Sequence, residues 1–459
     1  MRPIAGIFAN YRTKSFWLDH AATGYAESPA LEGLVRADVL VIGGGLTGVS
    51  TAYHLKLAEP SLRVALLEAE VVGYGASGRH AGFIAPVIGL PLSLMTARFG
   101  AQRTLEARRY AEHACAYAAQ VIQTNRLASE YEACDYLQVA ATPAQRRRAL
   151  QEVEFAHRLG ILAVDWIEAT PLRALIDSPT YLGAKREHGA ALLNPARFTR
   201  EIKRLAVAHG VEIYEHSPVI QLDFGPVIRA QTPRGAVEAD YCALAINAYA
   251  VQFPPLRSKQ CPLHFYAVAT EPLTPAQRNS LGWHDRQALS DTRALPHEYR
   301  LTADDRILVA GGDARYIAGN QTGMYSSARV FEDLAIFIDQ TFPSLRGIPI
   351  THQWGWVASA TADLTPALGF VSGDRRVVYS VGNLEHNAAL SLLNGRVLSD
   401  LLLERKTDLT DVFFVKRATI PLPPEPARSI IIHAALSILR ARDALDERRG
   451  LGDPAIRGA

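Results

Sequence analysis

The stretch that decides the fold reads DVLVIGGGLTGVSTAYHLKLAE and covers residues 38–59. Residues 38–42 form a short apolar run rich in β-branched side chains, which predicts a buried parallel strand. A glycine cluster follows, and residues 47–59 are compatible with a helix. Residues 63–68 (RVALLE) predict a second strand. Strand, glycine turn, helix and strand thus fit within about 30 residues, the length of a βαβ unit.

The glycines follow the spacing Gly43-x-Gly45-x-x-Gly48, and Glu68 lies 20 residues beyond Gly48, at the end of the second predicted strand. In such a motif one glycine makes the tight turn, one admits a pyrophosphate, and one lets helix and strand pack closely. The helix N-terminus favours phosphate, and an acidic residue in the place of Glu68 accepts from the ribose hydroxyls, which disfavours a 2′-phosphate. We therefore predict a dinucleotide site rather than a turn that serves packing alone. The predicted contacts are Gly43, Gly45, Leu46, Thr47, Gly48, Glu68 and Ala69.

A second small-residue stretch, GYGASGRHAG, covers residues 73–82. An NAD enzyme has no need for it just past the ribose-binding acid. FAD carries its isoalloxazine beyond the pyrophosphate, so a loop of small residues must follow the extended cofactor. FAD is therefore the predicted dinucleotide, and a plain glycine loop is the alternative. The predicted contacts are Gly75, Ala76, Ser77, Gly78, Arg79 and His80.

The composition bounds the class of protein. The chain has 459 residues, of which 48% are hydrophobic and 20% charged, so two or three globular domains are expected and wholesale disorder is excluded. The net charge of +2 indicates no nucleic-acid partner. None of the four cysteines lies in a CxxC or Cys/His pair, which predicts buried thiols in a reducing, cytoplasmic compartment and no metal site. Residues 80–97 lack charges, but His80, Pro86 and Pro91 interrupt them, so a buried loop is expected rather than a membrane span.

The rest of the chain alternates between helical and strand-like segments. Residues 101–157 predict mostly helix, residues 261–316 predict several strands, and no internal repeat is present. Further helices are expected at 196–209, 329–341, 387–405 and 427–448, and further strands at 211–215, 241–246 and 377–381. This order argues for an α/β chain that carries a second sheet.

The sequences ADVLVIGGGLTGVSTAYHL and VALLEAEVVGYGASGRHAGF resemble the D-amino-acid oxidase-like (DAO) superfamily of FAD enzymes, and its γ-glutamylputrescine oxidase-like branch in particular. The resemblance runs from about residue 16 to about residue 448. It implies a glutathione-reductase-like, Rossmann-type FAD-binding domain with an inserted mixed-sheet substrate domain. The implied division is 1–35 as an N-terminal extension, 36–95, 188–255 and 352–420 as the FAD-binding domain, 96–187 and 256–351 as the substrate domain, and 421–459 as linker and C-terminal helix.

The resemblance also implies contacts later in the chain. Val219, after the predicted helix and strand, would lie on the adenine side of FAD. The late loop before the last helix of the FAD-binding domain would lie at the pyrimidine end of the flavin through Gly382, Asn383, Leu384 and His386. The family's pattern there is G-x-x-G-H-G-x, whereas this chain reads GNLEHNA. Two glycines are replaced and Glu385 adds a negative charge, which leaves the flavin potential and FAD retention open.

Two further departures bear on the chemistry. His80 stands where the branch usually has Asn, and relatives attach flavin covalently through a histidine in this loop. Non-covalent FAD is favoured here, with attachment through His80 as the alternative. Residues 350–370 contain no cysteine for the linkage of monomeric sarcosine oxidases, and no lysine occurs between Lys259 and Lys406 to promote the reaction with oxygen. A dehydrogenase that uses another electron acceptor therefore stays open beside an oxidase.

The resemblance implies an FAD-dependent oxidoreductase that oxidises the C–N bond of an amine or N-substituted amino acid to an imine by hydride transfer to flavin N5. The flavin carries the hard step, so no protein base is required. The pocket candidates are His80, Tyr266, Tyr299 and Arg300, with Arg79, His264, His352, Trp354 and His386 as further lining residues. A hydroxy-acid substrate and a non-catalytic flavoprotein subunit are the alternatives, and a homo-oligomer or hetero-oligomer is left open.

The predicted C-terminal helix at residues 427–448 has a wide apolar face that includes Ile430, Ile431, Leu436 and Ile438. Packing on its own protein is the favoured interpretation. A dimer contact and docking on a membrane surface are the alternatives.

Overall fold

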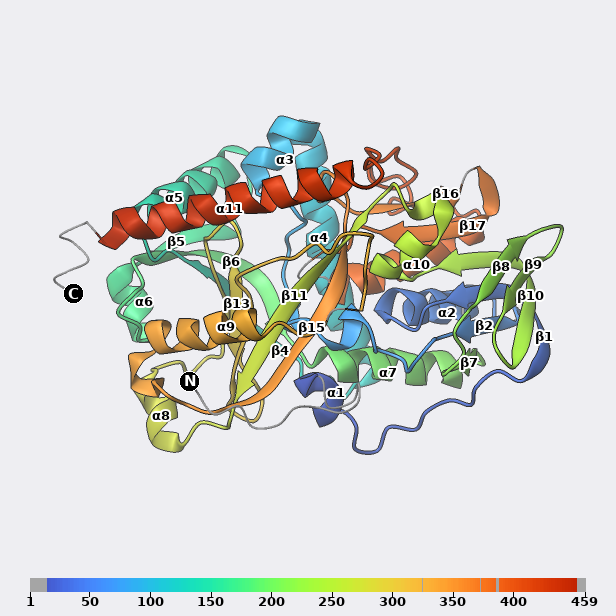
Figure 1. Ribbon diagram of the computed structural model, residues 1–459, viewed down its shortest axis with the longest axis horizontal. Helices are drawn as coiled ribbons and strands as arrows, with labels where there is room; N and C mark the ends of the chain where they lie inside the picture. The colour runs from blue at the N-terminus through green and yellow to red at the C-terminus, as the bar shows by residue number, and fades with distance from the viewer. Residues whose placement is uncertain (1–14, 324, 372, 385–387, 452–459) are drawn as a thin grey trace.

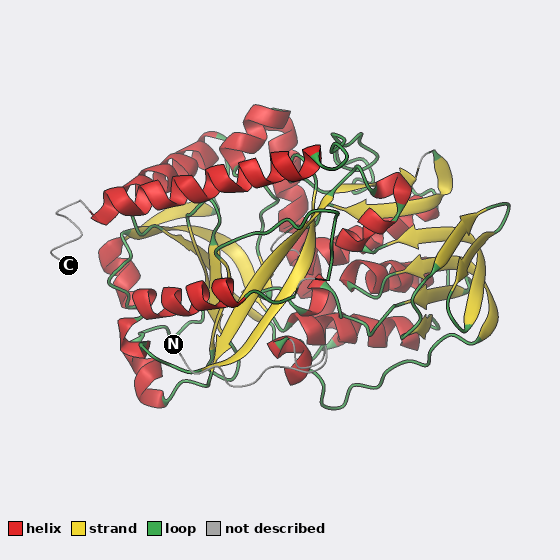
Figure 2. Cartoon of the chain, viewed as in Figure 1, coloured by secondary structure: helices red, strands yellow, loops and turns green. Residues whose placement is uncertain are grey.

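The computed structural model describes residues 15–323, 325–371, 373–384 and 388–451, which form two β-sheets with helices packed on and between them (Figures 1 and 2). The described helices are α1 (Phe16–His20), α2 (Leu46–Ala58), α3 (Leu92–Phe99), α4 (Ala101–Asn125), α5 (Pro143–Arg158), α6 (Ala169–Leu175), α7 (Pro195–Ala208), α8 (Pro275–Ser280), α9 (Ala328–Thr341), α10 (Ala388–Leu402) and α11 (Ala427–Leu451). The described strands are β1 (Gly33–Ile42), β2 (Val64–Leu67), β3 (Phe83–Ile84), β4 (Glu132–Val139), β5 (Val164–Glu168), β6 (Gly183–Leu192), β7 (Glu212–Tyr214), β8 (Gln221–Phe224), β9 (Ile228–Gln231), β10 (Gly235–Leu244), β11 (Cys261–Thr270), β12 (Ala288–Asp291), β13 (His297–Leu301), β14 (Ile307–Gly311), β15 (Ile350–Ala360), β16 (Ala367–Val371) and β17 (Asp374–Val381).

The first sheet contains the predicted βαβ unit. Its strand order is β16-β17-β10-β1-β2-β7, and β8 and β9 extend it beside β10. The five strands from β17 to β7 are parallel to one another. Leu40 and Ile42 of β1 face one side of this sheet, whereas Val39 and Val41 face the other. Both faces are buried, which explains why the sequence of β1 is a continuous apolar run.

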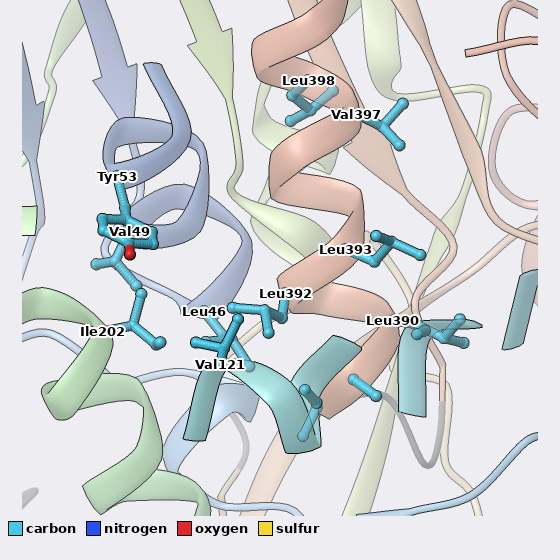
Figure 3. Packing of buried hydrophobic residues seen from close by; sticks show 14 of the residues in the cluster. Leu46, Val49, Tyr53, Val121, Ile202, Leu390, Leu392, Leu393, Val397 and Leu398 are labelled. Atoms are coloured by element: carbon cyan, nitrogen blue, oxygen red, sulfur yellow. The ribbon is translucent and has the colours of Figure 1, made fainter. Parts of the chain in front are cut away.

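Helices α2, α7 and α10 cover one face of this sheet. Leu46 and Val49 of α2 lie beside Leu392 of α10 and Ile202 of α7 in one apolar layer (Figure 3). Helices α2 and α10 approach each other closely at Gly395. A Cβ there would lie only 2.5 Å from the Cβ of Ser50, so this position needs a glycine. This packing fixes the position of the α2 N-terminus relative to the end of β17.

The second sheet has nine strands, in the order β15-β11-β14-β13-β12-β4-β6-β3, with β5 beside β6. Its pairs are antiparallel except for β4 and β12. One face, here called the outer face, carries Tyr266 and Tyr299 toward α9. The opposite face, the inner face, carries Phe265 and Ala310 and packs against the chain around Phe83.

The structure differs from the sequence-based expectations in two places. Residues 132–139 lie within the segment expected to be helical but form β4, because they complete the sheet between β12 and β6. The predicted domain boundaries at 188 and 352 fall inside β6 and β15, both of which belong to the nine-stranded sheet. The division into an FAD-binding and a substrate domain therefore stays a proposal, with these two strands moved to the substrate side.

The C-terminal helix α11 runs along the molecule past α5, as the red helix in Figure 1 shows. Leu436 on its inner side is 5% exposed and joins the inner-face cluster. Asp443 accepts hydrogen bonds from the backbone N–H groups of Ala294 and Leu295, at 2.8 and 3.1 Å. The helix thus packs on its own protein through this side, while Ile438 on the other side is 68% exposed. No described helix is both long enough and apolar enough to cross a membrane.

Candidate cofactor and substrate site

The predicted cofactor residues converge at one edge of the first sheet. The glycine turn follows β1, Glu68 follows β2, the turn that begins at Asn247 follows β10, and Gly382 follows β17. Because these four strands are parallel, their carboxyl ends meet at the same edge. In open α/β sheets, ligands bind in the crevice outside this edge.

Two of the three motif glycines are required by the fold, and the third is explained by cofactor binding. A Cβ at Gly43 would lie 2.6 Å from the carbonyl oxygen of Ala245, and a Cβ at Gly48 only 1.9 Å from that of Gly43. The fold itself therefore needs both. A Cβ at Gly45 would meet only the Oγ of Ser77, at 3.2 Å. The fold alone therefore does not require a glycine at position 45. A glycine here fits a pyrophosphate that approaches the backbone closely.

Gly45 is the N-cap residue of α2 and has no side chain that could cap the helix. The backbone N–H of Leu46 donates to the Oγ of Ser77, at 2.9 Å. Ser77 lies in the second small-residue stretch, so the two predicted cofactor loops are in direct contact. The open helix N-terminus with small residues around it fits the phosphates of FAD.

Glu68 lies across the turn, half-buried. Its carboxylate accepts from the N–H groups of Gly44 and Glu70, at 2.6 and 3.0 Å. Burial raises the pKa of Glu68 to about 7, and these two hydrogen bonds oppose the rise. Ser217 donates its backbone N–H to the Glu68 carbonyl, at 2.8 Å, which brings the segment before Val219 to the predicted adenosine end. Ala69, the next residue along the chain, is exposed.

The loop of residues 73–82 is held in place from several sides. Trp17 of α1 donates its Nε1–H to the His80 carbonyl at 2.9 Å, and Trp354 of β15 donates to the Arg79 carbonyl at 2.7 Å. Arg79 is buried between the rings of Tyr74 and Tyr325. Its guanidinium donates to the backbone carbonyls of Tyr74 and Gly355. The side chain of Arg79 therefore orders the loop.

The late loop reaches the same edge. Gly382 has a positive φ of 82°, and a Cβ there would lie 2.7 Å from the Cγ2 of Thr361. Asn383 accepts from Asn394 of α10 at 3.0 Å, and Leu384 packs against the inner-face cluster. The predicted contact His386 lies outside the described residues.

Asn247 is a candidate that the sequence-based set of contacts did not include. It begins the turn after β10 with a positive φ of 41°, and its Oδ1 is buried with no hydrogen-bond partner among the described residues. The backbone just before it touches Gly43. The NAY sequence of this turn could have marked Asn247 as a candidate, because Asn tolerates a left-handed backbone where most residues do not.

The structure separates the pocket candidates onto the two faces of the second sheet. His80 and Trp354 lie at the inner face, and His352, which bonds to Asp19, is on the same side of β15 as Trp354. Tyr266, Tyr299 and His264 lie on the outer face. Tyr299 is fully buried with its hydroxyl 2.8 Å from that of Tyr181, and His264 lies beside the carbonyl of Arg315.

Arg300 lies on the inner face, but its guanidinium is committed to the backbone. It donates to the carbonyls of Gly82, Leu193 and Leu301, at 3.2, 2.7 and 3.2 Å. The side chain is 1% exposed, and burial lowers its pKa to about 10. Arg300 thus ties the sheet to the loop of residues 73–82 in the manner of a structural residue.

A cavity of about 620 Å³ lies on the outer face, between β11, the start of α9 and α11. Tyr266, Asp313 and Arg440 are among its lining residues, and Asp313 pairs with both Arg315 and Arg440. Ser326 and Ser327 also line the cavity, and the preceding residue, Tyr325, contacts Tyr74 and Arg79 of the loop of residues 73–82. Tyr266 points from the outer face into this cavity and does not join the inner-face cluster.

Comparison with known proteins agrees with this geometry. The family model described as FAD dependent oxidoreductase (DAO) matches residues 38–401. The chain is 28% identical over 392 residues to the γ-glutamylputrescine oxidoreductase of Escherichia coli, which covers 83% of this chain and 87% of that protein. It is 23% identical over 390 residues to the glycine oxidase of Bacillus licheniformis, which covers 83% and 98%.

Solved structures share the fold. Glycine oxidase from Geobacillus kaustophilus superposes with a TM-score of 0.69 at 18% identity, over 84% of this chain and 100% of that chain. L-Amino acid deaminase from Proteus myxofaciens gives 0.68 at 18%, over 85% and 97%. The predictions of an α/β fold with a Rossmann-type FAD domain, of FAD as cofactor and of an oxidoreductase are confirmed. The chain belongs to the DAO family of FAD-dependent oxidoreductases.

Proposed function

We propose that this enzyme oxidises the C–N bond of an amine or amino-acid derivative to an imine, which water then hydrolyses. The observation that carries the proposal is the placement of the inner face of the second sheet directly against the cofactor loops. Ala81 lies in the loop of residues 73–82, Phe83 directly follows this loop, and Leu384 lies in the late loop. All three pack in the same cluster as the inner-face residues. Relatives named for γ-glutamylputrescine and for glycine support a C–N substrate.

FAD, when bound, supplies the two-electron acceptor for the hydride that leaves the carbon next to the amine nitrogen. The chain supplies enclosure and orientation. Phe265, Trp354 and Trp356 give the inner face an aromatic, water-excluding surface. Aromatic walls also suit an amine cation on its way into the site. The guanidinium of Arg300 is bonded to backbone carbonyls, so the described contacts do not assign it to a substrate carboxylate. Arg79 donates to backbone carbonyls through Nε and Nη1, while its buried Nη2 has no hydrogen-bond partner among the described residues.

The cofactor and the substrate are tested in sequence. The purified protein is expected to show a flavin band that passes into the supernatant on acid precipitation, since non-covalent FAD is proposed. Colour retained in the pellet would instead assign covalent attachment, with His80 as the first residue to replace. The flavin is then mixed anaerobically with N-acetylputrescine, N-methylglycine, glycine and L-lactate. Bleaching by an amine supports the proposal, and bleaching by lactate alone would replace it with hydroxy-acid oxidation.

The electron acceptor is a separate question. The inner-face positions of β14 carry Leu308 and Ala310, so this strand presents no cation to the cofactor side. A positive charge there would stabilise the developing superoxide, so we favour a dehydrogenase with an acceptor other than oxygen. Anaerobically reduced enzyme mixed with air-saturated buffer should reoxidise slowly, and reoxidation within one turnover time would assign an oxidase.

We also propose a cytoplasmic location and leave the oligomeric state open. The four cysteines are free thiols, in keeping with a reducing compartment such as the cytoplasm. Either a homo-oligomer or a subunit of a hetero-oligomer is compatible with the amine-oxidising role. A non-catalytic subunit is the competing function, which the altered late loop favours. FAD that no amine of the panel reduces, or failure to take up FAD at all, would support it.

A further inference from the structure

A carboxyl group that no sequence motif marks lies on the inner face of the second sheet. Glu298 is in β13, in register with Ser290 of β12 and Ala310 of β14. Tyr299 and Leu301 point to the outer face, so Glu298 and Arg300 point to the inner face. The two are two residues apart, about 7 Å along the strand. Because Arg300 reaches the carbonyl of Gly82, Glu298 shares a face with the contact to the cofactor loop.

Polar groups gather around this carboxyl group in an otherwise apolar surface. Tyr136 of β4 is 1% exposed, and its hydroxyl lies 2.7 Å from the Oγ of Ser290. The ring of Tyr136 packs edge-on against Phe83, which directly follows the loop of residues 73–82. Glu298 thus lies on the strand between the Tyr136–Ser290 pair and β14, at the side of the sheet where the cofactor loops pack. Glu298 is thus one of a few polar groups on an inner face that is otherwise mostly apolar, and a few placed polar groups on an apolar lining are how ligand sites fix orientation.

Glu298 is 8% exposed, and burial raises its pKa to about 8. A carboxyl group in such surroundings favours its neutral form and takes up a proton readily. The other titratable or charged side chains of β4 and β13 on this side are Tyr136 and Cys134, which pack in the inner-face cluster, and Arg300, with the carboxyl group of Glu132 near its guanidinium. β12 and β14 contribute only Ser290, Ala288, Leu308 and Ala310 to the inner face. Buried carboxyl groups of raised pKa in a site of this kind are candidates for proton transfer.

Resting on the proposed amine oxidation, we propose that Glu298 receives the ammonium group of the substrate and accepts its excess proton. The substrate class is then a cationic primary or secondary amine, and no carboxylate next to the reacting carbon is required.

The proton balance is simple. The substrate enters as R–NH₃⁺ opposite Glu298–COO⁻, one N–H bond breaks, and one O–H bond forms to give R–NH₂ and Glu298–COOH. No net charge is created, and the low-dielectric site favours the neutral pair over the ion pair. The nitrogen lone pair that this step exposes is what permits hydride loss from the adjacent carbon. Hydride departure leaves an iminium ion with the electron pair carried away on the hydride.

The test compares Glu298→Gln, which keeps the shape and removes the charge, with Glu298→Asp, which keeps a carboxyl group. Glu132→Gln on β4, which pairs with the far side of β12, is the matched control. In the wild-type holoenzyme, the second-order rate constant for anaerobic flavin reduction by N-acetylputrescine should rise tenfold per pH unit up to about pH 8 and then level off. Glu298→Gln can use only the free amine, so its rate constant should continue to rise to the amine pKa of about 10. At pH 8 it should be lower than the wild type by roughly 100-fold, which is the scarcity of free amine at that pH.

A second measurement, made without substrate, tests the protonation of Glu298 independently of the reduction rates. The visible band of the oxidised flavin is titrated between pH 6 and 10 in the absence of substrate. The wild type and Glu132→Gln should show a spectral step near pH 8 that Glu298→Gln lacks. Glu298→Asp should retain the step and the plateau of the rate profile, with slower reduction because the shorter side chain lies farther from the amine. FAD content is measured for every variant to exclude loss of the cofactor.

The outcomes separate the two levels of the proposal. If amines bleach the wild-type flavin and Glu298→Gln keeps the same pH profile and spectral step, the assignment of Glu298 is overturned and amine oxidation stands. If no amine bleaches the wild-type flavin while L-lactate does, amine oxidation fails and the role of Glu298 fails with it. A Glu298→Asp variant with the profile of Glu298→Gln would show that the carboxyl group acts through packing alone.

Discussion

At the scale of single residues, the cofactor motif contains two kinds of glycine. Gly43 and Gly48 are required by the chain itself, since an added Cβ at either would strike a backbone oxygen. Gly45 has an ordinary backbone conformation, with φ of −71°, and space beside it. A substitution at Gly45 should therefore separate cofactor binding from folding, whereas one at Gly48 should not.

We predict that Gly45→Val abolishes FAD binding and leaves the cofactor-free protein folded. The valine side chain meets only the Ser77 hydroxyl, at 3.2 Å from its Cβ, but fills the space in which the pyrophosphate would lie. The flavin-to-protein absorbance ratio and circular dichroism check this. Gly48→Ala is the comparison, and it should unfold or fail to accumulate because its Cβ would lie 1.9 Å from the Gly43 oxygen. FAD content like that of the wild type in Gly45→Val would refute the site assignment.

Glu68 should make FAD affinity depend on pH. Its pKa rises from 4.5 to about 7 on folding, so the carboxylate form costs free energy and this group lowers the stability of the cofactor-free protein as pH rises from about 4.5 to 7. FAD needs the carboxylate as an acceptor for its ribose hydroxyls. The dissociation constant for FAD should therefore rise as pH falls below 7, by up to about tenfold per pH unit.

Fluorescence titration of the cofactor-free protein with FAD, between pH 5.5 and 8.5, measures this dependence. Glu68→Gln should bind FAD more weakly at pH 8 and lose the dependence, since an amide does not titrate. A pH dependence that persists in Glu68→Gln would assign it to another group.

At the scale of elements, α11 illustrates how one helix divides an apolar surface between its own protein and solvent. Its mixed sequence places apolar residues on more than one side. Leu436 is buried against the inner-face cluster, while Ile430, Ile431 and Ile438 are 67%, 54% and 68% exposed. Ion pairs and caps reinforce the inner side, since Asp446 pairs with Arg148 at 2.6 Å. The position of each residue relative to the sheet, rather than its hydrophobicity, determines how much it contributes to the free energy of unfolding.

A matched pair of substitutions on α11 should therefore behave differently. Leu436→Ala should lower the free energy of unfolding by about 3 kcal/mol, because it removes a buried side chain and leaves a cavity. Ile438→Asp should leave the thermal midpoint unchanged, because the side chain is already in solvent. Thermal melting followed by circular dichroism distinguishes them. Equal effects of the two changes would contradict the observed orientation of the helix.

At the scale of the whole molecule, the cofactor loops couple the two sheets. The loop of residues 73–82 leaves the first sheet's edge and is bonded by Trp354 and Arg300 of the second sheet. Trp17 of the N-terminal segment adds a third attachment to the same loop. The inner-face cluster of the second sheet also includes Ala81 of this loop, and Leu384 of the late loop packs against it. Binding of FAD would therefore reinforce contacts that belong to both halves of the protein.

We predict that FAD raises the thermal midpoint of the whole molecule in one cooperative transition. A ligand that binds only the folded state stabilises it by RT ln(1 + [L]/Kd), which is about 2.7 kcal/mol at one hundred times Kd. Differential scanning calorimetry of cofactor-free protein with increasing FAD measures this. NADP is the control and should leave the midpoint unchanged, since its 2′-phosphate opposes Glu68. Two separate transitions, of which FAD shifts only one, would contradict the coupling.

The βαβ unit, the dinucleotide motif and the choice of FAD were predictable from the sequence, because they depend on local spacing. Glycines that make a turn, an acid at the end of the next strand and a second small-residue loop are all readable within 45 residues of chain. The sequence also indicated that strands from separate segments build a second sheet. The strand at residues 132–139 was not predicted, because it is stabilised by partner strands that are far away in the sequence.

The tertiary structure alone decided which candidates can meet a substrate. Tyr299 and Arg300 are adjacent in sequence, yet they point to opposite faces of the sheet because successive side chains alternate along a strand. The same alternation brings Glu298, which no motif marks, to the side of the cofactor loops. Whether an arginine is available to a ligand or committed to backbone carbonyls likewise depends on residues more than 100 positions away. Local spacing predicts a cofactor motif, whereas a substrate pocket is assembled from distant strands, and only folding brings these together.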